Sequence, residues 1–188
     1  FGRGPPSTGL GLQYSDAMPR SWSLSAKLGA IGATLLLMAF ASIGLTLWVT
    51  WQLEGGAAAV NEAGRMRMQT WRLAQTLERA DDRQKIALFE QFDQSIAVLR
   101  SGDPSRPLFV PHDHASRESF AVVQREWDVL KAAWRAPTSP GAERTALQAE
   151  AFVIRIDAFV SAIERHLSRL TSILNAAQFV MVALTIAS

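Results

Sequence analysis

The chain has 188 residues, a formal net charge of +2 and no cysteine, which excludes disulfides and thiolate metal sites. Between residues 54 and 169 the acidic and basic residues are equal in number, so the positive excess lies in the N-terminal part. A nucleic-acid-binding protein concentrates its basic residues on the folded region. The charge distribution therefore argues against a nucleic-acid partner.

The first 22 residues are predicted to be a disordered cytoplasmic tail. They begin "FGRGPPSTGLGLQYSD", which is rich in Gly, Pro and Ser and has no apolar periodicity. The chain opens on Phe1, whereas Met18 begins a stretch typical of a protein start. Residues 1–17 are thus expected to be either a flexible tail or an over-extended reading frame.

The next segment, residues 28–53, is apolar and free of charge. It exceeds the roughly 20 residues that span a bilayer, and we predict a first transmembrane helix over residues 23–53. The alternative is a cleaved signal peptide, because "AFA" at residues 39–41 imitates a cleavage site, but the apolar run continues well past it. Interfacial tryptophans flank the run, and the basic tail before it predicts a cytoplasmic N-terminus. These tryptophans are Trp22, Trp48 and Trp51.

A second uncharged segment, residues 170–188, predicts a second transmembrane helix that is cut short. The alternative is a buried amphipathic tail, because Asn175 and Gln178 dilute its apolar character. Two spans in an inner membrane would place residues 54–169 in the periplasm. The lipid bilayer is therefore an expected partner, and the expected location is a two-pass protein of the bacterial inner membrane.

Four helical patterns fill the region around residues 54–169. The first continues from the first span, the second covers residues 81–100, and the fourth runs without interruption into the second span. Two proline-containing loops separate the last three helical patterns, "SGDPSRPLFVP" before the third and "APTSPG" before the fourth. No stretch alternates with period two. The sequence predicts an all-α fold, an antiparallel up-down four-helix bundle continuous with two transmembrane helices. The expected core positions are Ile86, Phe89, Phe92, Ile96 and Leu99, then Phe120, Val123, Trp127, Leu130 and Trp134, then Val153, Ile156, Val160, Ile163, Leu167, Leu170 and Leu174.

Catalytic and metal-binding motifs are not evident. The chain has no nucleophile elbow, no Gly-rich phosphate loop and no His-Glu-x-x-His. His112 and His114 lack a convergent third and fourth ligand and are expected to be solvent-exposed rather than metal ligands. His166 is expected on the surface. We predict no catalytic residue, no metal site and no cofactor in this chain.

The segment "NEAGRMRMQTWRL", residues 61–73, holds three arginines. Arg65 has Glu62 three residues before it and is expected to pair with it. Arg67 and Arg72 have no acid three or four residues away. Arg67 also falls on a helical stripe that is expected to be buried. The residues alone leave two interpretations for both arginines. Each side chain reaches either an acid on another helix or the solvent, or it binds a ligand. The stripe consists of Val60, Ala63, Arg67, Thr70, Ala74 and Leu77.

This segment resembles the periplasmic signature of the nitrate/nitrite sensor histidine kinases. That signature reads Asn-x-Ala-Gly-x-x-Arg-Met-Gln-x-aromatic-Arg-Leu, and Trp71 stands at its aromatic place. The stretch "GDPSRPLFVP" and the two later tryptophans are also similar to the middle of this sensor domain, which type IV pilus chemoreceptors share in looser form. Glu62 and Arg65 depart from the pattern. The matching residues are Asn61, Ala63, Gly64, Arg67, Met68, Gln69, Arg72 and Leu73.

The resemblance implies a homodimer in which the first sensor helices meet at a two-fold axis, with Arg67 as the ligand for nitrate or nitrite. Two facing guanidinium groups repel, and a planar oxyanion between them accepts paired hydrogen bonds from both. Binding would then favour one dimer arrangement over another. Supporting residues are expected to be Gly64, Ala63, Met68, Thr70 and Trp71. Structural or signalling roles are expected for Asn61, Gln69 and Arg72, the last by pairing with an acid on another helix.

The resemblance predicts the membrane-bound sensor portion of a two-component nitrate/nitrite-responsive histidine kinase. The chain itself is expected to be non-catalytic. A kinase domain using ATP and Mg²⁺, and a cytoplasmic response regulator as partner, are expected only for a missing region. The alternatives are the ligand-sensing domain of a chemoreceptor-like transducer and a plain membrane-anchored helical scaffold. Signal is expected to cross as a small shift of the spans, with Gly55 and Gly56 as a soft point of the first helix.

Overall fold

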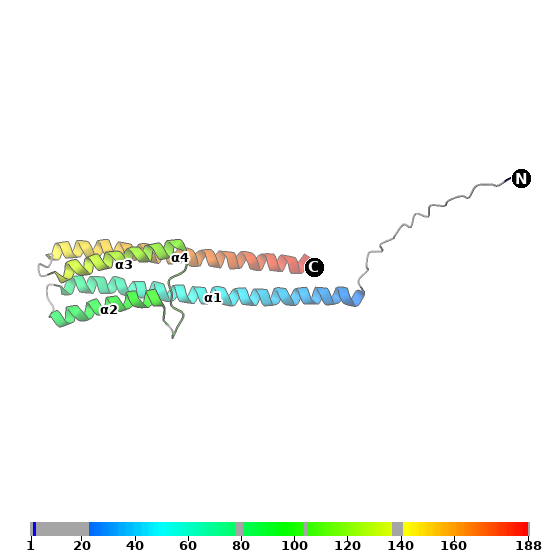
Figure 1. Ribbon diagram of the computed structural model, residues 1–188, viewed down its shortest axis with the longest axis horizontal. Coiled ribbons are helices and arrows are strands. Elements are labelled where there is room, and N and C mark those ends of the chain that lie inside the picture. Colours follow the sequence, from blue (N-terminus) through cyan, green and yellow to red (C-terminus); the bar gives the residue numbers. More distant parts are fainter. Residues whose placement is uncertain (1, 3–22, 78–80, 104, 137–140, 188) are drawn as a thin grey trace.

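The computed structural model describes residue 2 and residues 23–77, 81–103, 105–136 and 141–187, without the side chain of residue 187. The predicted disorder of residues 1–22 falls almost entirely outside these ranges. Four helices make up the described part: α1 (Leu24–Thr76), α2 (Asp82–Ser101), α3 (His114–Arg135) and α4 (Ala142–Ala187). Successive helices run in opposite directions (Figure 1). This confirms the predicted all-α, up-down arrangement.

The helix ends follow local sequence. The Ser23 hydroxyl accepts a hydrogen bond from the Ala26 N–H at 3.3 Å and caps the start of α1. Asp113 caps α3 in the same way, accepting from the Ser116 N–H at 3.1 Å. Helix α2 ends at Ser101 and is capped by Gly102, whose φ of 78° lies in the left-handed region that glycine adopts without strain. The chain therefore leaves the axis of α2 at Gly102.

The core lies between the four helices, centred on Trp127 of α3. Its ring stacks on Phe92 of α2 with centroids 3.8 Å apart, and Phe152 of α4 lies beside it at 6.0 Å. The indole N–H donates to Asp93 at 2.8 Å, so the buried polar atom is satisfied. Trp134 is also buried and donates to Gln148 at 2.9 Å. The prediction that both tryptophans serve packing is confirmed.

The burial pattern confirms most expected core positions. All five expected on α3 are buried, as are Phe89, Phe92, Ile96 and Leu99 of α2. Ile86 is 50% exposed, so its predicted place in the core is wrong. On α4 the pattern missed Phe152 and Phe159, which are fully buried. They lie on the core side next to Val153 and Val160, because a helix facing several neighbours buries a wider stripe than one residue per turn.

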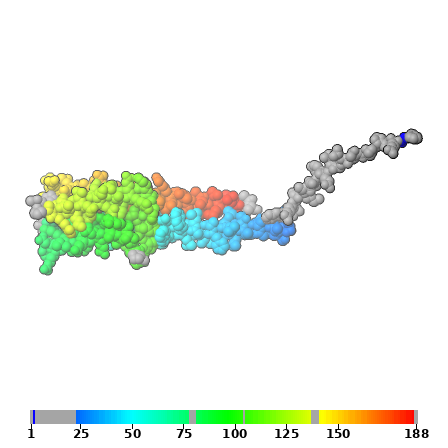
Figure 2. Space-filling model, viewed as in Figure 1, coloured from blue at the N-terminus to red at the C-terminus, as the bar shows by residue number. Residues whose placement is uncertain are grey.

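Two helices extend beyond the bundle. The first half of α1 and the last part of α4 project from the same end and run side by side (Figures 1 and 2). Each is long and apolar enough to cross a membrane, and their large apolar side chains, such as Leu37, Phe40 and Phe179, are exposed. Exposed apolar side chains over such a length fit a lipid environment rather than a protein core. The chain thus has two candidate membrane spans attached to one bundle.

Candidate functional site

The structure places Arg67 at the border between α1 and α4. Its Nη1 donates to the Asp157 carboxylate of α4 at 2.8 Å, and the two side chains are 42% and 49% exposed. The sequence left open whether Arg67 pairs with an acid on another helix, reaches solvent or binds a ligand. This ion pair matches the first of these interpretations. Asp157 lies ninety positions after Arg67 in the sequence, so helical periodicity alone could not predict this pair.

The predicted buried stripe is displaced by about one residue. The side of α1 that faces the other helices is lined by Ala59, Ala63, Met66, Thr70, Leu73 and Leu77, all buried. Arg67 lies on the flank of this stripe rather than at its centre. A stripe with spacings of three and four residues can pass through either Met66 or Arg67. The bundle buries Met66, because burying a guanidinium without a partner costs free energy. The prediction of a guanidinium along the buried seam of the chain is therefore wrong.

The other residues expected around Arg67 separate into two groups. Ala63, Gln69 and Thr70 are buried inside the bundle, and the Gln69 side-chain oxygen accepts from the Ser95 hydroxyl at 3.3 Å. The remaining residues stay on the outside of α1. Met68 is 60% and Trp71 40% exposed. Asn61 and Arg72 are exposed, and Gly64 is half-buried beside Arg67.

The two other arginines of the segment differ in their contacts. Arg65 pairs with the buried carboxylate of Glu62 at 3.3 Å, which confirms the predicted local ion pair. Arg72 forms no ion pair within the part of the chain that the structure describes. The expected pairing of Arg72 with an acid on another helix is thus not found there.

The histidines were expected on the surface, and two of them are. His112 and His114 are exposed, and His114 lies 3.4 Å from Glu118. His166 is only 23% exposed and faces Asp113 at 3.3 Å, so its predicted surface position is wrong. Burial acts to raise the pKa of Asp113, but the hydrogen bonds from Ser116 and the nearby His166 outweigh it and lower that pKa. Among the described residues no group of three or more potential metal ligands comes together.

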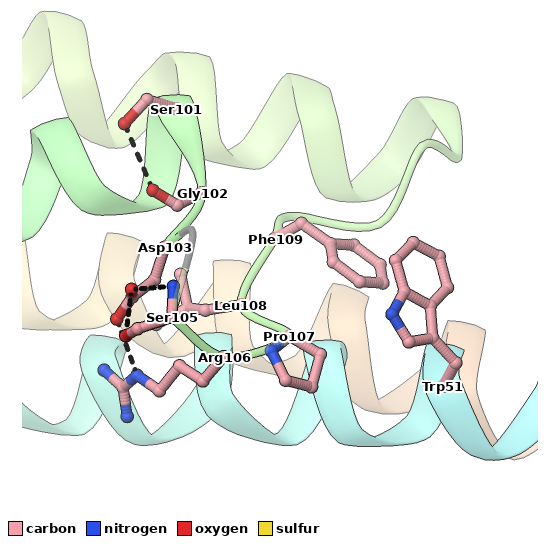
Figure 3. Close-up of a pocket in the computed structure, with 9 residues that line it drawn as sticks. All are labelled: Trp51, Ser101, Gly102, Asp103, Ser105, Arg106, Pro107, Leu108 and Phe109. Atoms are coloured by element: carbon pink, nitrogen blue, oxygen red, sulfur yellow. Dashed lines mark hydrogen bonds and ion pairs between the residues drawn. The ribbon is translucent and has the colours of Figure 1, made fainter.

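A second cluster, absent from the sequence prediction, lies where α1 enters its apolar half. Gly55 and Gly56 are buried. A Cβ on Gly55 would lie 2.1 Å from Cε1 of Phe109, and one on Gly56 would lie 2.6 Å from Cδ2 of Leu167. The Phe109 ring also packs against Trp51, with centroids 4.6 Å apart (Figure 3). We call these five residues the membrane-proximal cluster.

This cluster gives Gly55 and Gly56 a packing role that the sequence did not predict, and the expectation that they soften α1 stays a prediction. The helix runs through both glycines without interruption. Because glycine has no Cβ, the loop between α2 and α3 and the side chain of Leu167 approach the α1 backbone closely. Two adjacent glycines inside a helix were the available signal, since close backbone approach is a common reason for glycine there.

The loop that carries Phe109 is held by its own hydrogen bonds. Asp103 accepts from the Ser105 N–H at 2.9 Å and hydroxyl at 2.6 Å, and from Arg106 Nε at 2.9 Å. These bonds lower the pKa of Asp103 to about 2, those from Ser105 contributing most. The loop and Trp51 border an open cavity of about 770 Å³ (Figure 3). The Asp103 carboxylate thus holds Ser105 and Arg106 together at the start of this loop.

Together, these features define a class of protein: a membrane-anchored helical bundle whose first and last helices continue into apolar spans. The family model PilJ, described as "Type IV pili methyl-accepting chemotaxis transducer N-term", matches residues 48–152. This match covers more than half of the chain, and the chain belongs to that family. It includes both the Arg67 segment and the loop from Gly102 to Asp113. Comparison with curated proteins found no match.

Proposed function

We propose that this chain is the ligand-sensing and membrane-spanning part of a chemoreceptor-like transducer of the type IV pilus kind. The family match over residues 48–152 supports this alternative more than it supports a nitrate/nitrite histidine kinase. The single observation that carries the proposal is the continuity of α1 and α4 from the bundle into the apolar segments. A ligand that favours one arrangement of the bundle would displace these helices relative to each other, and the spans would follow.

Relative movement of the two spans is the step to test. Met38 of α1 and Met181 of α4 line the same gap between the apolar segments, and the chain has no cysteine of its own. The chain would be joined at its C-terminal end to the cytoplasmic signalling module of a methyl-accepting receptor. In this hybrid, oxidation of a Met38→Cys/Met181→Cys pair is expected to lock the output, measured as activity of the coupled kinase.

The controls are the two single-cysteine variants, in which oxidation should leave the output unchanged. Reduction of the double variant should restore regulation. Complete cross-linking without any effect on kinase activity would contradict transmission through the relative position of α1 and α4.

We also propose that the N-terminus is cytoplasmic and the bundle periplasmic. The support is the excess of Lys/Arg ahead of the first span. Alkaline phosphatase inserted after Gly141, in the connection before α4, should be active in a Gram-negative host. Activity only of a cytoplasmic reporter at the same position would reverse the orientation.

A second candidate function is recognition of a small oxyanion, nitrate or nitrite, by Arg67 in a homodimer. The guanidinium is partly exposed, and the nearest neighbour of a Cβ on Gly64 would be Arg67 Nη2 at 3.8 Å, so the outer face of α1 is open there. Met68 and Trp71 are exposed on the same side, where a second copy would cover them. Asp157 is the competitor, since an anion would take over hydrogen bonds that this carboxylate now accepts. A shared site predicts one anion for every two chains.

A further inference from the structure

A separate cavity of about 420 Å³ lies at the membrane-proximal end of α2 and α3. It is bordered by the last turn of α2, the loop from Gly102 to Asp113 and the first turns of α3. Its size falls within the range of small-molecule sites. The Arg67 site is on α1 and α4, so none of its residues contributes. The polar side chains of the lining are those of Arg100, Ser101, His112, Arg117 and Gln124.

The cavity is positively charged. Arg100 and Arg117 form no ion pair with any carboxylate in the described ranges. With the Gln124 amide oriented so that its oxygen faces α2, Arg100 donates to it from Nε and Nη2 at 3.0 Å each. This partner is neutral, so it orients the guanidinium and leaves its charge uncompensated. An anionic group in the cavity would supply that compensation.

The acids near the cavity are engaged elsewhere. Asp103 accepts hydrogen bonds from Ser105 and Arg106. Asp113 caps α3 through Ser116 and faces His166 of α4. Neither carboxylate lines the cavity. The two arginines of the cavity therefore remain available to a ligand.

Apolar side chains also line the cavity. Leu99 and Phe120 are buried at its base, and the half-buried Phe109 and Val110 complete the wall. A hydrated inorganic ion gains little from such a surface, whereas a ligand with a carboxylate and an apolar body would use both parts. The lining thus suits an anion that carries an apolar body.

We propose that this cavity binds a small carboxylate with an apolar body, with Arg100 and Arg117 as its charge partners. Phe109 connects the site to the membrane boundary, because the side chain that lines the cavity also rests on Gly55 and Trp51 of α1. A ligand that displaces Phe109 would change the packing of α1 where it enters its span. The role in sensing rests on the proposed function, but binding itself can be measured on the chain alone.

The test is calorimetric titration of the full chain in dodecyl maltoside without phospholipid. The probes are benzoate, a planar carboxylate on an apolar ring, and benzamide, its uncharged counterpart. Benzoate should bind saturably with one site per chain, and benzamide at least about tenfold more weakly. Arg117→Gln and Arg100→Gln should each weaken benzoate binding by about tenfold or more, as loss of a charged hydrogen bond implies.

The matched control is Arg83→Gln, which removes an exposed arginine at the far end of α2 and should leave the affinity unchanged. Arg67→Ala should leave it unchanged as well, which separates this cavity from the site on α1. Helical content by circular dichroism verifies that each variant is folded. Wild-type affinity in both cavity variants, or no saturable binding of benzoate, would overturn the proposal and leave the transducer assignment standing.

A lipid headgroup is the competing occupant, because the cavity lies at the membrane-proximal end. Benzoate affinity would be compared in nanodiscs of phosphatidylcholine and of phosphatidylglycerol. The same affinity within about twofold, a factor worth well under 1 kcal/mol, supports a soluble ligand. Loss of benzoate binding in phosphatidylglycerol nanodiscs, but not in phosphatidylcholine nanodiscs, would identify the cavity as a binding site for a lipid headgroup and overturn the proposal.

Discussion

Two glycine-containing stretches of α1 lie less than three turns apart and have opposite environments. Gly55 and Gly56 are buried under Phe109 and Leu167, whereas Gly64 faces an open surface beside Arg67. The first pair lets other parts of the same chain approach the helix backbone. Gly64 has no such neighbour among the residues that the structure describes. The difference shows that glycine allows close packing within the chain at the membrane-proximal cluster, whereas further along the same helix it lies on an open surface.

The largest effect is expected from breaking α1 at the membrane-proximal cluster. Four glycines inserted between Leu53 and Glu54 should abolish regulated output of the receptor hybrid. The insertion displaces the span by about 6 Å along the axis and rotates it by roughly 40° relative to Gly55. Kinase activity would be measured together with benzoate binding, which should persist. The same insertion between Gly141 and Ala142 is the control, and regulated output in the α1 variant would contradict rigid transmission.

Gly55→Ala tests the close approach of Phe109. The added Cβ would lie 2.1–2.7 Å from three ring atoms, so the ring must move away. We expect destabilisation of about 1–3 kcal/mol, the usual cost of overpacking. Guanidinium unfolding of the chain in detergent, followed by circular dichroism, measures it. In Gly55→Ala/Phe109→Ala the clash is gone, and the two effects should be non-additive. Additive effects would show that Phe109 does not rest on Gly55.

Arg67→Ala tests the Arg67 site. It should weaken nitrate binding at least about tenfold, yet change stability by no more than about 1 kcal/mol, because the pair with Asp157 is half exposed. Arg67→Lys keeps the positive charge but loses the planar guanidinium group, so this variant should also bind nitrate weakly.

Asp157→Asn sharpens the Arg67 experiment. If Asp157 competes with the anion, its neutralisation should tighten nitrate binding severalfold. Calorimetry would provide both the affinity and the number of anions per chain. Wild-type affinity in Arg67→Ala, or one anion per chain, would exclude a shared Arg67 site.

The smallest effect is expected from Gly64→Ala. Among the described residues, and apart from the backbone of α1 itself, only Arg67 Nη2 lies within 4 Å of the added methyl group. The gain in helix propensity should therefore stabilise the chain by up to about 1 kcal/mol. The unfolding experiment used for Gly55→Ala gives the direct comparison. Destabilisation comparable to that of Gly55→Ala would show that another copy of the chain packs on Gly64.

The sequence by itself determined the elements that depend on local pattern. Apolar length predicted two spans, and steps of three and four predicted the helices and their core residues, including Trp127 and Trp134. Glu62 and Arg65, three residues apart on one helix, were predicted to pair and do so. These features follow from helix geometry, which relates residues within a few positions of each other.

Only the tertiary structure decided which residues meet across the bundle. Periodicity placed Arg67 in a buried seam, but packing buries Met66 and leaves Arg67 beside Asp157. The sequence marks Gly55 and Gly56 as a soft point of the helix, and only the tertiary structure shows that Phe109 and Leu167 pack closely against them. Such contacts join residues about fifty to over one hundred positions apart. Their geometry depends on how whole helices and a loop come together, and spacing along one helix carries no information about that.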